Sequence, residues 1–273
     1  MTVPGKTVSI VLPCYNEEST VEQTLAALQR LAEAFAVDGI AMEIVAVDDA
    51  SADNTGARLR EGVPGPAKIR VETHPRNRGK GAAIQTARSL VSGDIVVIQD
   101  ADLEYDPSDI PVLVQPIVNG FADAVLGTRF GGSGPHRVLY FWHRVGNGWL
   151  TLLSNMFTNL NVTDMETGYK AFTRDAFLAM HLTNNRFGIE PEMLARLSQM
   201  GARVYEVPVS YYGRTYAEGK KITWRDGFAA IYHIVRAALT SSRQGTLALP
   251  PRGRSNPTMQ RKLTPVTPQR ALT

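Results

Sequence analysis

Several features that define common protein classes are missing from this 273-residue chain. The single cysteine, Cys14, excludes a disulfide-stabilised scaffold and a zinc site built on cysteines, and it is compatible with a reducing compartment. None of the five histidines stands at a metal-ligand spacing from Cys14 or from paired acids, so we expect no histidine metal site. No apolar run is long enough to cross a bilayer, and no charged-then-apolar leader opens the chain. We therefore predict neither a transmembrane segment nor secretion.

The motifs of three enzyme classes are absent as well. No Gly-x-Gly-x-x-Gly sequence follows the first predicted strand, which argues against a dinucleotide-dependent dehydrogenase. Lys80 is followed by Gly81 instead of Ser or Thr, so the chain has no Walker A loop. No Gly-x-Ser-x-Gly elbow supports hydrolysis by a serine triad. A repeat of about 20–50 residues is also missing, which excludes solenoids and propellers.

Acidic residues are absent from residues 241–273, which contain six basic residues and five prolines. Residues 1–240 hold 23 basic and 26 acidic residues, so the formal net charge of +3 combines a mildly acidic body with a basic end. This composition predicts one catalytic domain over residues 1–240 and a disordered basic tail over residues 241–273. Because no uniformly basic domain is present, we expect no nucleic-acid partner. A non-catalytic scaffold that binds through its basic tail is the alternative to an enzyme.

Short apolar runs alternate with amphipathic helices through the first half of the chain. Strands are predicted at Val8–Leu12, Met42–Val47, Lys68–Glu72, Asp94–Ile98 and Asp123–Leu126. This alternation is typical of an α/β fold with a mostly parallel, Rossmann-like central sheet and helices on both faces. Clusters of polar residues follow three of these runs, at Pro13–Glu18, Asp48–Asn54 and Asp100–Glu104. Ligands of such sheets bind beyond the carboxyl ends of the strands, so we expect a site there.

The second half is less regular. Strands are predicted at Gly168–Thr173 and Ala202–Tyr212, with a helix near Pro191–Met200 between them. Amphipathic helices are predicted near 138–160 and 224–240, and residues 145–163 carry no charged side chain. Polar residues interrupt both helices, so neither spans a bilayer. Contact with a membrane surface, core packing and contact with a partner are the alternatives for their apolar faces.

Asp100-Ala101-Asp102, directly after an apolar run, is the sharpest motif in the chain. Two carboxylates one residue apart at a strand end offer the oxygen ligands that Mg²⁺ and Mn²⁺ prefer, and they could share the cation with a diphosphate. The alternative is an acidic strand terminus that caps a helix. Without a cation, however, clustered carboxylates would repel one another.

Three further motifs admit two interpretations each. Asp48-Asp49 fits hydrogen bonding to a nucleoside or a helix N-cap, and Asn77–Gly81 fits a phosphate at a helix start or a simple glycine turn. The basic-aromatic segment Tyr211–Lys221 fits an anion clamp or a solvated loop.

The order of the motifs resembles family 2 glycosyltransferases of the GT-A fold. More narrowly, it is similar to the polyprenyl-phosphate sugar synthases of the dolichyl-phosphate mannose synthase and undecaprenyl-phosphate glucose transferase type. The matching segments are Ile10–Glu18, Val47–Ser51, Asn77–Gly81, Gln99–Tyr105, Gly127–Phe130, Glu166–Lys170 and Arg214–Lys221. The likeness extends from residue 7 to about residue 238.

The resemblance implies a role for individual residues. The nucleotide sugar would be bound by Pro13, Tyr15, Glu17, Asp48, Asp49, Lys80, Asp100, Ala101 and Asp102. The acceptor phosphate would be bound by Arg129, Arg144, Arg214 and Lys221. Asp100 and Asp102 would hold Mg²⁺ or Mn²⁺, and together with Arg129 and Arg214 they would be the catalytic residues.

The resemblance also implies a reaction and a location. The expected enzyme is a metal-dependent, inverting hexosyltransferase that uses UDP- or GDP-hexose and a polyprenyl phosphate. It would lie peripherally on the cytoplasmic face of the membrane, with a second copy of itself or a separate membrane protein as a further partner. The same chemistry on a soluble or glycan acceptor is the alternative.

Overall fold

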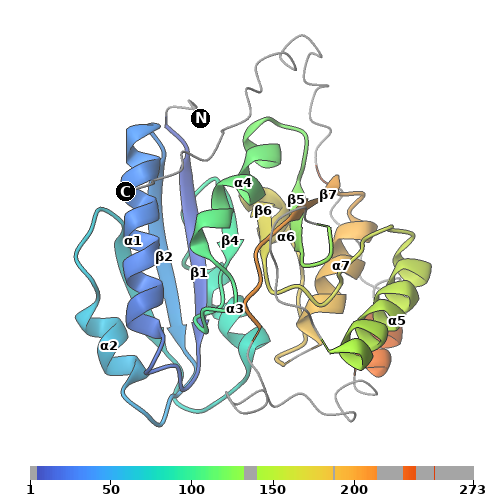
Figure 1. Cartoon of the computed structure of the whole chain (residues 1–273), viewed down its shortest axis with the longest axis horizontal. Helices are drawn as coiled ribbons and strands as arrows, with labels where there is room; N and C mark the ends of the chain where they lie inside the picture. Colours follow the sequence, from blue (N-terminus) through green and yellow to red (C-terminus); the bar gives the residue numbers. More distant parts are fainter. Residues whose placement is uncertain (1–4, 132–139, 187, 214–229, 238–248, 250–273) are drawn as a thin grey trace, which may run out of the picture.

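A seven-stranded sheet forms the centre of the protein, for which the computed structural model describes residues 5–131, 140–186, 188–213, 230–237 and 249. Its strands are β1 (Thr7–Cys14), β2 (Ala41–Asp48), β3 (Lys68–Thr73), β4 (Ile95–Ile98), β5 (Ala124–Thr128), β6 (Lys170–Thr173) and β7 (Val204–Pro208). They lie in the order β3-β2-β1-β4-β6-β5-β7 (Figure 1). All neighbours are parallel except β6, which runs antiparallel to both β4 and β5. The prediction of a mostly parallel sheet is confirmed.

Helices cover both faces of the sheet, because the central strands are apolar on both sides. The helices are α1 (Val21–Val37), α2 (Thr55–Glu61), α3 (Lys80–Arg88), α4 (Ile110–Val118), α5 (Phe141–Thr158), α6 (Arg174–Ala179) and α7 (Ile189–Gln199), with a 3-10 turn η1 (Pro107–Asp109) before α4. One core cluster joins the sheet to α1 and α4, and a second joins the opposite face to α3, α6 and α7. Alternate residues of β1 divide between them, since Ile10 and Leu12 belong to the first cluster and Val11 to the second.

A third, smaller cluster lies beyond the β7 end of the sheet. It contains Leu126, Leu194 and Ile234, with Leu150 and Leu153 of α5 packed against it. Residues 230–237, which are helical, therefore lie near α5 and α7 at the right of Figure 1. The rest of the helix predicted near 224–240, and the tail predicted over 241–273 apart from residue 249, lie outside the described residues.

The structure adds elements that the sequence pattern did not predict. Helices α2 and α6 are only seven and six residues long, too short to show a helical period. The antiparallel insertion of β6 between β4 and β5 depends on long-range pairing, for example of Val97 with Ala171. This insertion brings the Glu166–Lys170 segment beside the acidic end of β4.

Candidate active site

The polar segments after β1, β2 and β4 meet at one edge of the sheet. Cys14 pairs with Asp48, and Val11 pairs with Ile98, so the three strands end side by side. Each segment then turns through a non-glycine residue with positive φ, namely Asn16 (55°), Ala50 (59°) and Leu103 (61°). This conformation is uncommon for such residues and concentrates at binding and catalytic sites. The same uncommon backbone conformation thus occurs after all three strand ends at which the site was expected.

The two adjacent aspartates at the end of β2, Asp48 and Asp49, are both buried, and they make different contacts. The Asp49 carboxylate accepts hydrogen bonds from the backbone amides of Arg78 (2.9 Å) and Gly79 (2.6 Å) and lies 2.6 Å from His74 Nδ1. Asp49 therefore fixes the loop before α3, a function that its position in the sequence did not reveal. Asp48 Oδ1 accepts the backbone amide of Ser51 at 3.0 Å.

The first strand end supplies a more open wall of the site. Tyr15 is 48% exposed, whereas Pro13 and Glu17 are half-buried. The backbone amide of Glu17 donates to Thr55 Oγ1 at 2.8 Å, which ties this segment to the start of α2. The structure thus places Pro13, Tyr15 and Glu17 at the same sheet edge as Asp48, as a nucleoside-binding role would require.

The carboxylate of Asp100 lies against the ammonium group of Lys80. Lys80 Nζ is 2.8 Å from Asp100 Oδ1 and 3.4 Å from Glu190 Oε1. Burial alone would lower the pKa of Lys80, but the charges of Asp100 and Glu190 outweigh it and raise the pKa. A β-carbon at Gly168 would clash with Asp100 Oδ2, so a larger residue at position 168 would have to displace the Asp100 carboxylate. The structure therefore brings two predicted site residues, Lys80 and Asp100, into contact. It also adds Glu190, which the sequence gave no reason to select.

Asp102 and Ala101 complete the segment after β4. Asp102 is partly exposed and its Oδ1 accepts the backbone amide of Glu104 at 3.1 Å. Ala101 is buried, and its carbonyl accepts the hydroxyl of Thr24 at 3.2 Å. Ala101 therefore anchors the turn to α1, while the carboxylates on either side of it stay on the site edge.

Two further ionisable groups, Glu166 and Lys170, lie close to the Lys80–Asp100–Glu190 cluster, and neither was among the predicted site residues. Burial, reinforced by the charge of Glu190, raises the pKa of Glu166 to about 7. Burial lowers the pKa of Lys170 to about 8. Glu166 Oε1 and Glu190 Oε2 are buried oxygens without a hydrogen-bond partner in the described part of the chain. Such orphan oxygens are costly, and they concentrate where a ligand or a proton completes the network.

Replacing Glu166 with glutamine should remove a pH dependence of stability. Between the ordinary carboxyl pKa and about 7, folded Glu166 holds a proton that the unfolded chain has lost, so the wild type loses stability as the pH rises through this window. The loss amounts to about 3 kcal/mol at most. Urea unfolding between about pH 5 and 7.5 should give a flatter profile for Glu166→Gln than for an exposed control, Glu33→Gln. Parallel profiles for all three proteins would contradict the raised pKa.

Arg129, the predicted acceptor-binding residue after β5, is held by a buried acid. Its Nε lies 2.6 Å from Asp164 Oδ2 and its Nη2 lies 2.7 Å from Asp164 Oδ1, a bidentate ion pair. Asp164 is fully buried, and Tyr211 lies under the guanidinium, 5.0 Å from the ring centroid. The ion pair fixes the orientation of Arg129, and the negative charge of Asp164 offsets much of the positive charge of the guanidinium.

The other predicted acceptor-binding residues divide into two groups. Arg144 on α5 is exposed and stacks on Phe130, with its guanidinium carbon 3.6 Å from the ring centroid. Arg129 also lies 5.5 Å from this ring, so the two arginines share one aromatic neighbour. Arg214 and Lys221 lie outside the described residues.

We call the carboxylates of Glu17, Asp48, Asp100 and Asp102, at the ends of β1, β2 and β4, the acidic edge. Three buried tyrosines lie between this edge and Arg129. Tyr105 lies 4.9 Å from Tyr169 and 5.2 Å from Tyr211, measured between ring centroids. The Tyr105 hydroxyl accepts the backbone amide of Gly168 at 2.9 Å, and burial raises the pKa of Tyr105 to about 12. These tyrosines stay neutral and fix the distance between the two charged parts of the site.

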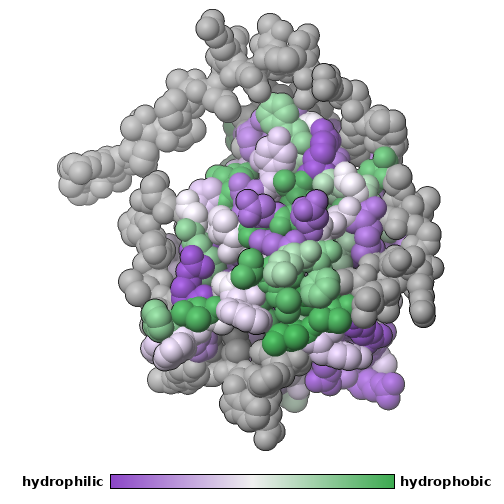
Figure 2. Space-filling view, turned by 90° about the vertical axis from the view of Figure 1, so that its right-hand side faces the viewer, coloured by the Kyte–Doolittle hydropathy of each residue, from purple (hydrophilic) through white to green (hydrophobic). Residues whose placement is uncertain are grey.

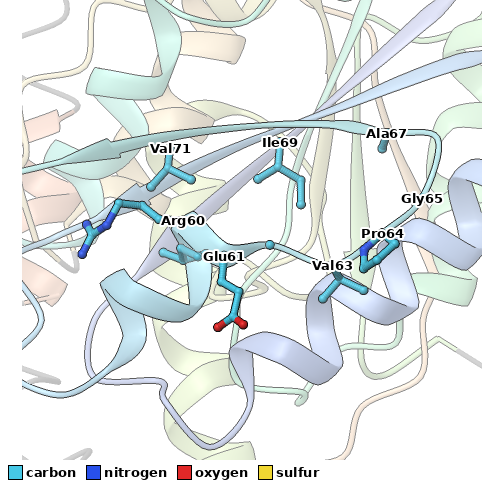
Figure 3. A pocket seen from close by; sticks show the side chains of 10 residues that line it. Arg60, Glu61, Val63, Pro64, Gly65, Ala67, Ile69 and Val71 are labelled. Carbon is cyan, nitrogen blue, oxygen red and sulfur yellow. The ribbon is translucent and has the colours of Figure 1, made fainter.

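A separate hollow lies away from this site. It is formed by the end of α2, the loop over residues 62–67 and the edge strand β3, with Val63, Ile69 and Val71 in its wall (Figure 3). No predicted site residue lines it. We therefore assign it no part in the chemistry at the strand ends.

The donor set at β4 fits a hard divalent cation only together with a bound ligand. Asp100 and Asp102 supply carboxylate oxygens, but no three His, Cys, Asp or Glu side chains gather into a metal cage within the described residues. Mg²⁺ is commonly held by one or two carboxylates plus substrate phosphates and waters. The residues present therefore suit a cation that arrives with a nucleoside diphosphate.

Comparisons with known proteins define the class of the molecule. The fold matches glucosyl-3-phosphoglycerate synthase from Mycobacterium tuberculosis, solved with Mn²⁺, UDP and phosphoglyceric acid, with a TM-score of 0.64. The two chains are 23% identical, and the match covers 88% of this chain and 79% of the other. The predicted GT-A fold is confirmed.

The family follows from the sequence. The model of the family "Glycosyl transferase family 2" matches residues 9–179, so the chain belongs to this family, as predicted. A UDP-N-acetylglucosamine–dolichyl-phosphate N-acetylglucosaminyltransferase of Methanococcus voltae is 26% identical, over 84% of this chain and 95% of the other. A dolichol-phosphate mannosyltransferase of Pyrococcus furiosus is 27% identical, over 84% and 63%. The chain spans 34–73% of the length of three Haloferax volcanii glycosyltransferases that are 29–31% identical to it.

Proposed function

We propose that the protein transfers a hexose from a nucleoside diphosphate sugar to a polyprenyl phosphate at a membrane surface, with inversion at the anomeric carbon. The observation that carries this proposal is the division of the site. Carboxylates gather after β1, β2 and β4, while Arg129 and Arg144 lie together beyond β5 and share the ring of Phe130. Relatives named for dolichyl-phosphate acceptors support the lipid as substrate.

The acidic edge is suited to the sugar donor. Asp48, Tyr15 and Glu17 would bind the nucleoside, and Lys80 would approach the diphosphate from the start of α3. A divalent cation bound by Asp100 and Asp102 would neutralise charge that develops on the leaving nucleoside diphosphate. Because Lys80 already pairs with Asp100, it supplies a second positive charge at the same place.

Arg129 and Arg144, which we call the arginine edge, are suited to bind the acceptor. A phosphate monoester has a second pKa of about 6, so it is largely a dianion near neutral pH and needs no strong base to become a nucleophile. What it needs is orientation and charge balance, which arginine supplies through its planar fork of donors. Asp164 holds Arg129 in place for this role, and Arg144 adds an exposed guanidinium beside it.

A single displacement by the acceptor phosphate predicts the stereochemistry of the product. The enzyme should be incubated in detergent with an α-linked nucleotide sugar, polyprenyl phosphate and Mn²⁺ or Mg²⁺, and the lipid product examined by mass spectrometry and NMR. We expect a β-linked glycosyl phosphate. An α-linked product would contradict the single displacement, and the absence of any glycolipid across UDP- and GDP-hexoses would contradict the acceptor.

A soluble phosphorylated acceptor is the second candidate. The structural neighbour from Mycobacterium tuberculosis was solved with phosphoglyceric acid, which also carries a phosphate. The arginine edge alone does not distinguish a soluble phosphate from a lipid phosphate. The surface beside it, formed by α5, favours the lipid.

A further inference from the structure

Helix α5 presents its large apolar side chains to solvent. The exposed side chains, which we call the α5 ridge, are Phe141, Trp142, Val145, Trp149, Leu152 and Met156. Since successive helical residues are about 100° apart, these six positions share one face that spans roughly 100°. Trp142 is 76% exposed and Met156 is 73% exposed. Figure 2, which views this side of the molecule, shows hydrophobic residues gathered over its lower part.

Small polar residues occupy the opposite, buried face of α5. Thr151, Ser154 and Thr158 are buried there, and Leu150 and Leu153 beside them pack against the third core cluster. The polar part of this inner face departs from the usual pattern of a surface helix, whose buried stripe is apolar. Thr151 Oγ1 accepts the backbone amide of Met165 at 3.2 Å, and Asn155 Nδ2 donates to the carbonyl of Val162 at 2.8 Å. These hydrogen bonds tie the inner face of α5 to the loop before β6, and the α5 ridge therefore faces solvent.

The charge around the ridge matches an anionic surface. Residues 124–163 contain no acidic side chain, although they include Arg129 and Arg144. The ridge and its surroundings are rich in aromatic residues, with Tyr232 of the 230–237 helix also 60% exposed. Helix α5 itself carries the exposed Arg144 and no acidic residue, whereas the charge of Arg129 is balanced by the buried Asp164. An apolar face with aromatic side chains on a basic helix is typical of helices that lie in the headgroup region of a bilayer. A second copy of the same basic surface would bring like charges together.

We propose that the α5 ridge inserts into the headgroup region of an anionic lipid bilayer and so docks the protein on the membrane. The same helix reaches the proposed acceptor site, because Asn147 Nδ2 donates to Asp164 Oδ1 at 3.2 Å and Arg144 stacks beside Arg129 on Phe130. The docked helix holds these arginines at the height of lipid phosphates. This last step rests on the proposed function, whereas membrane binding itself requires no sugar transfer.

Tryptophan fluorescence provides a direct test. The chain has three tryptophans, so the full-length Trp224→Phe variant reports only from Trp142 and Trp149, both on the ridge. Vesicles of phosphatidylcholine with about 30% phosphatidylglycerol attract the bases, and about 0.5 M salt weakens attraction through the basic tail. The vesicles contain neither polyprenyl phosphate nor nucleotide sugar, so the result is independent of catalysis. We expect a blue shift and strong quenching by brominated acyl chains.

Matched variants locate the binding surface. Trp149→Ser/Leu152→Ser/Met156→Ser should weaken vesicle binding by at least about tenfold, because it removes buried apolar area from the contact. Val37→Ser/Val112→Ser changes exposed apolar residues on α1 and α4 and should bind like the wild type. Vesicle binding without quenching of Trp142 and Trp149 would overturn the proposal. Absence of vesicle binding by the wild type would overturn it too. So would light scattering that shows a dimeric wild type and a monomeric ridge variant.

Discussion

Asp102→Asn is expected to reduce sugar transfer by about 100- to 1000-fold, a loss typical of removing one charged group that stabilises a leaving group. Asparagine keeps an oxygen that can accept the backbone amide of Glu104, so the turn after β4 should stay intact. The charge is lost, however, and a neutral amide is a much weaker ligand for a divalent cation. Thermal unfolding without ligands should therefore be unchanged while turnover falls.

Nucleotide binding separates this effect from a general defect. A nucleoside diphosphate with Mn²⁺ should raise the melting temperature of the wild type by mass action, and this rise should shrink in Asp102→Asn. Glu33→Gln, a change of the same charge on an exposed face of α1, should behave like the wild type in both assays. A fully active Asp102→Asn enzyme would refute the assignment of this carboxylate to the cation.

Replacing Asp164 by alanine is expected to lower the free energy of unfolding by about 3–5 kcal/mol, because it leaves the largely buried guanidinium of Arg129 without its counter-ion. Urea unfolding measures this loss directly. A loss below about 1 kcal/mol, the value of a surface ion pair, would mean that the pair is solvated.

The double variant Arg129→Met/Asp164→Leu distinguishes stability from function. Replacing both members of a buried ion pair with apolar residues is often neutral for stability, so most of the lost stability should return. Transfer should remain low, since the acceptor phosphate has lost a guanidinium, while nucleotide binding at the acidic edge should be normal. Wild-type turnover in the stable double variant would show that Arg129 acts only through the fold.

The half of the site built by parallel strands could be predicted from the sequence. Each of β1, β2 and β4 is a short apolar run followed at once by polar residues, so Asp48 and Asp100 could be placed at one edge without knowing any long-range contact. The helix start at Asn77–Gly81 fitted a phosphate site or a glycine turn, and only the family resemblance assigned Lys80 to the nucleotide sugar; the structure brings Lys80 against Asp100.

The other half depends on contacts that no local pattern reveals. Glu190 reaches Lys80 from α7, and Asp164 reaches Arg129 from the loop before β6, both across long stretches of chain. The burial that shifts the pKa of Glu166 arises only when β6 inserts between β4 and β5. The outward orientation of α5 is likewise fixed by hydrogen bonds at its inner face, and its apolar pattern alone fitted a buried helix equally well.

The destination of the sugar tests the proposed function most directly. Radiolabelled nucleotide sugar should be given in one tube to equal concentrations of a polyprenyl phosphate and phosphoglyceric acid, with detergent and a divalent cation, and the mixture then extracted with organic solvent. We predict that the label moves to the organic phase and that Asp102→Asn slows this movement by about 100- to 1000-fold. Label transferred only to a water-soluble product would contradict the lipid acceptor and assign the arginine edge to a soluble phosphate.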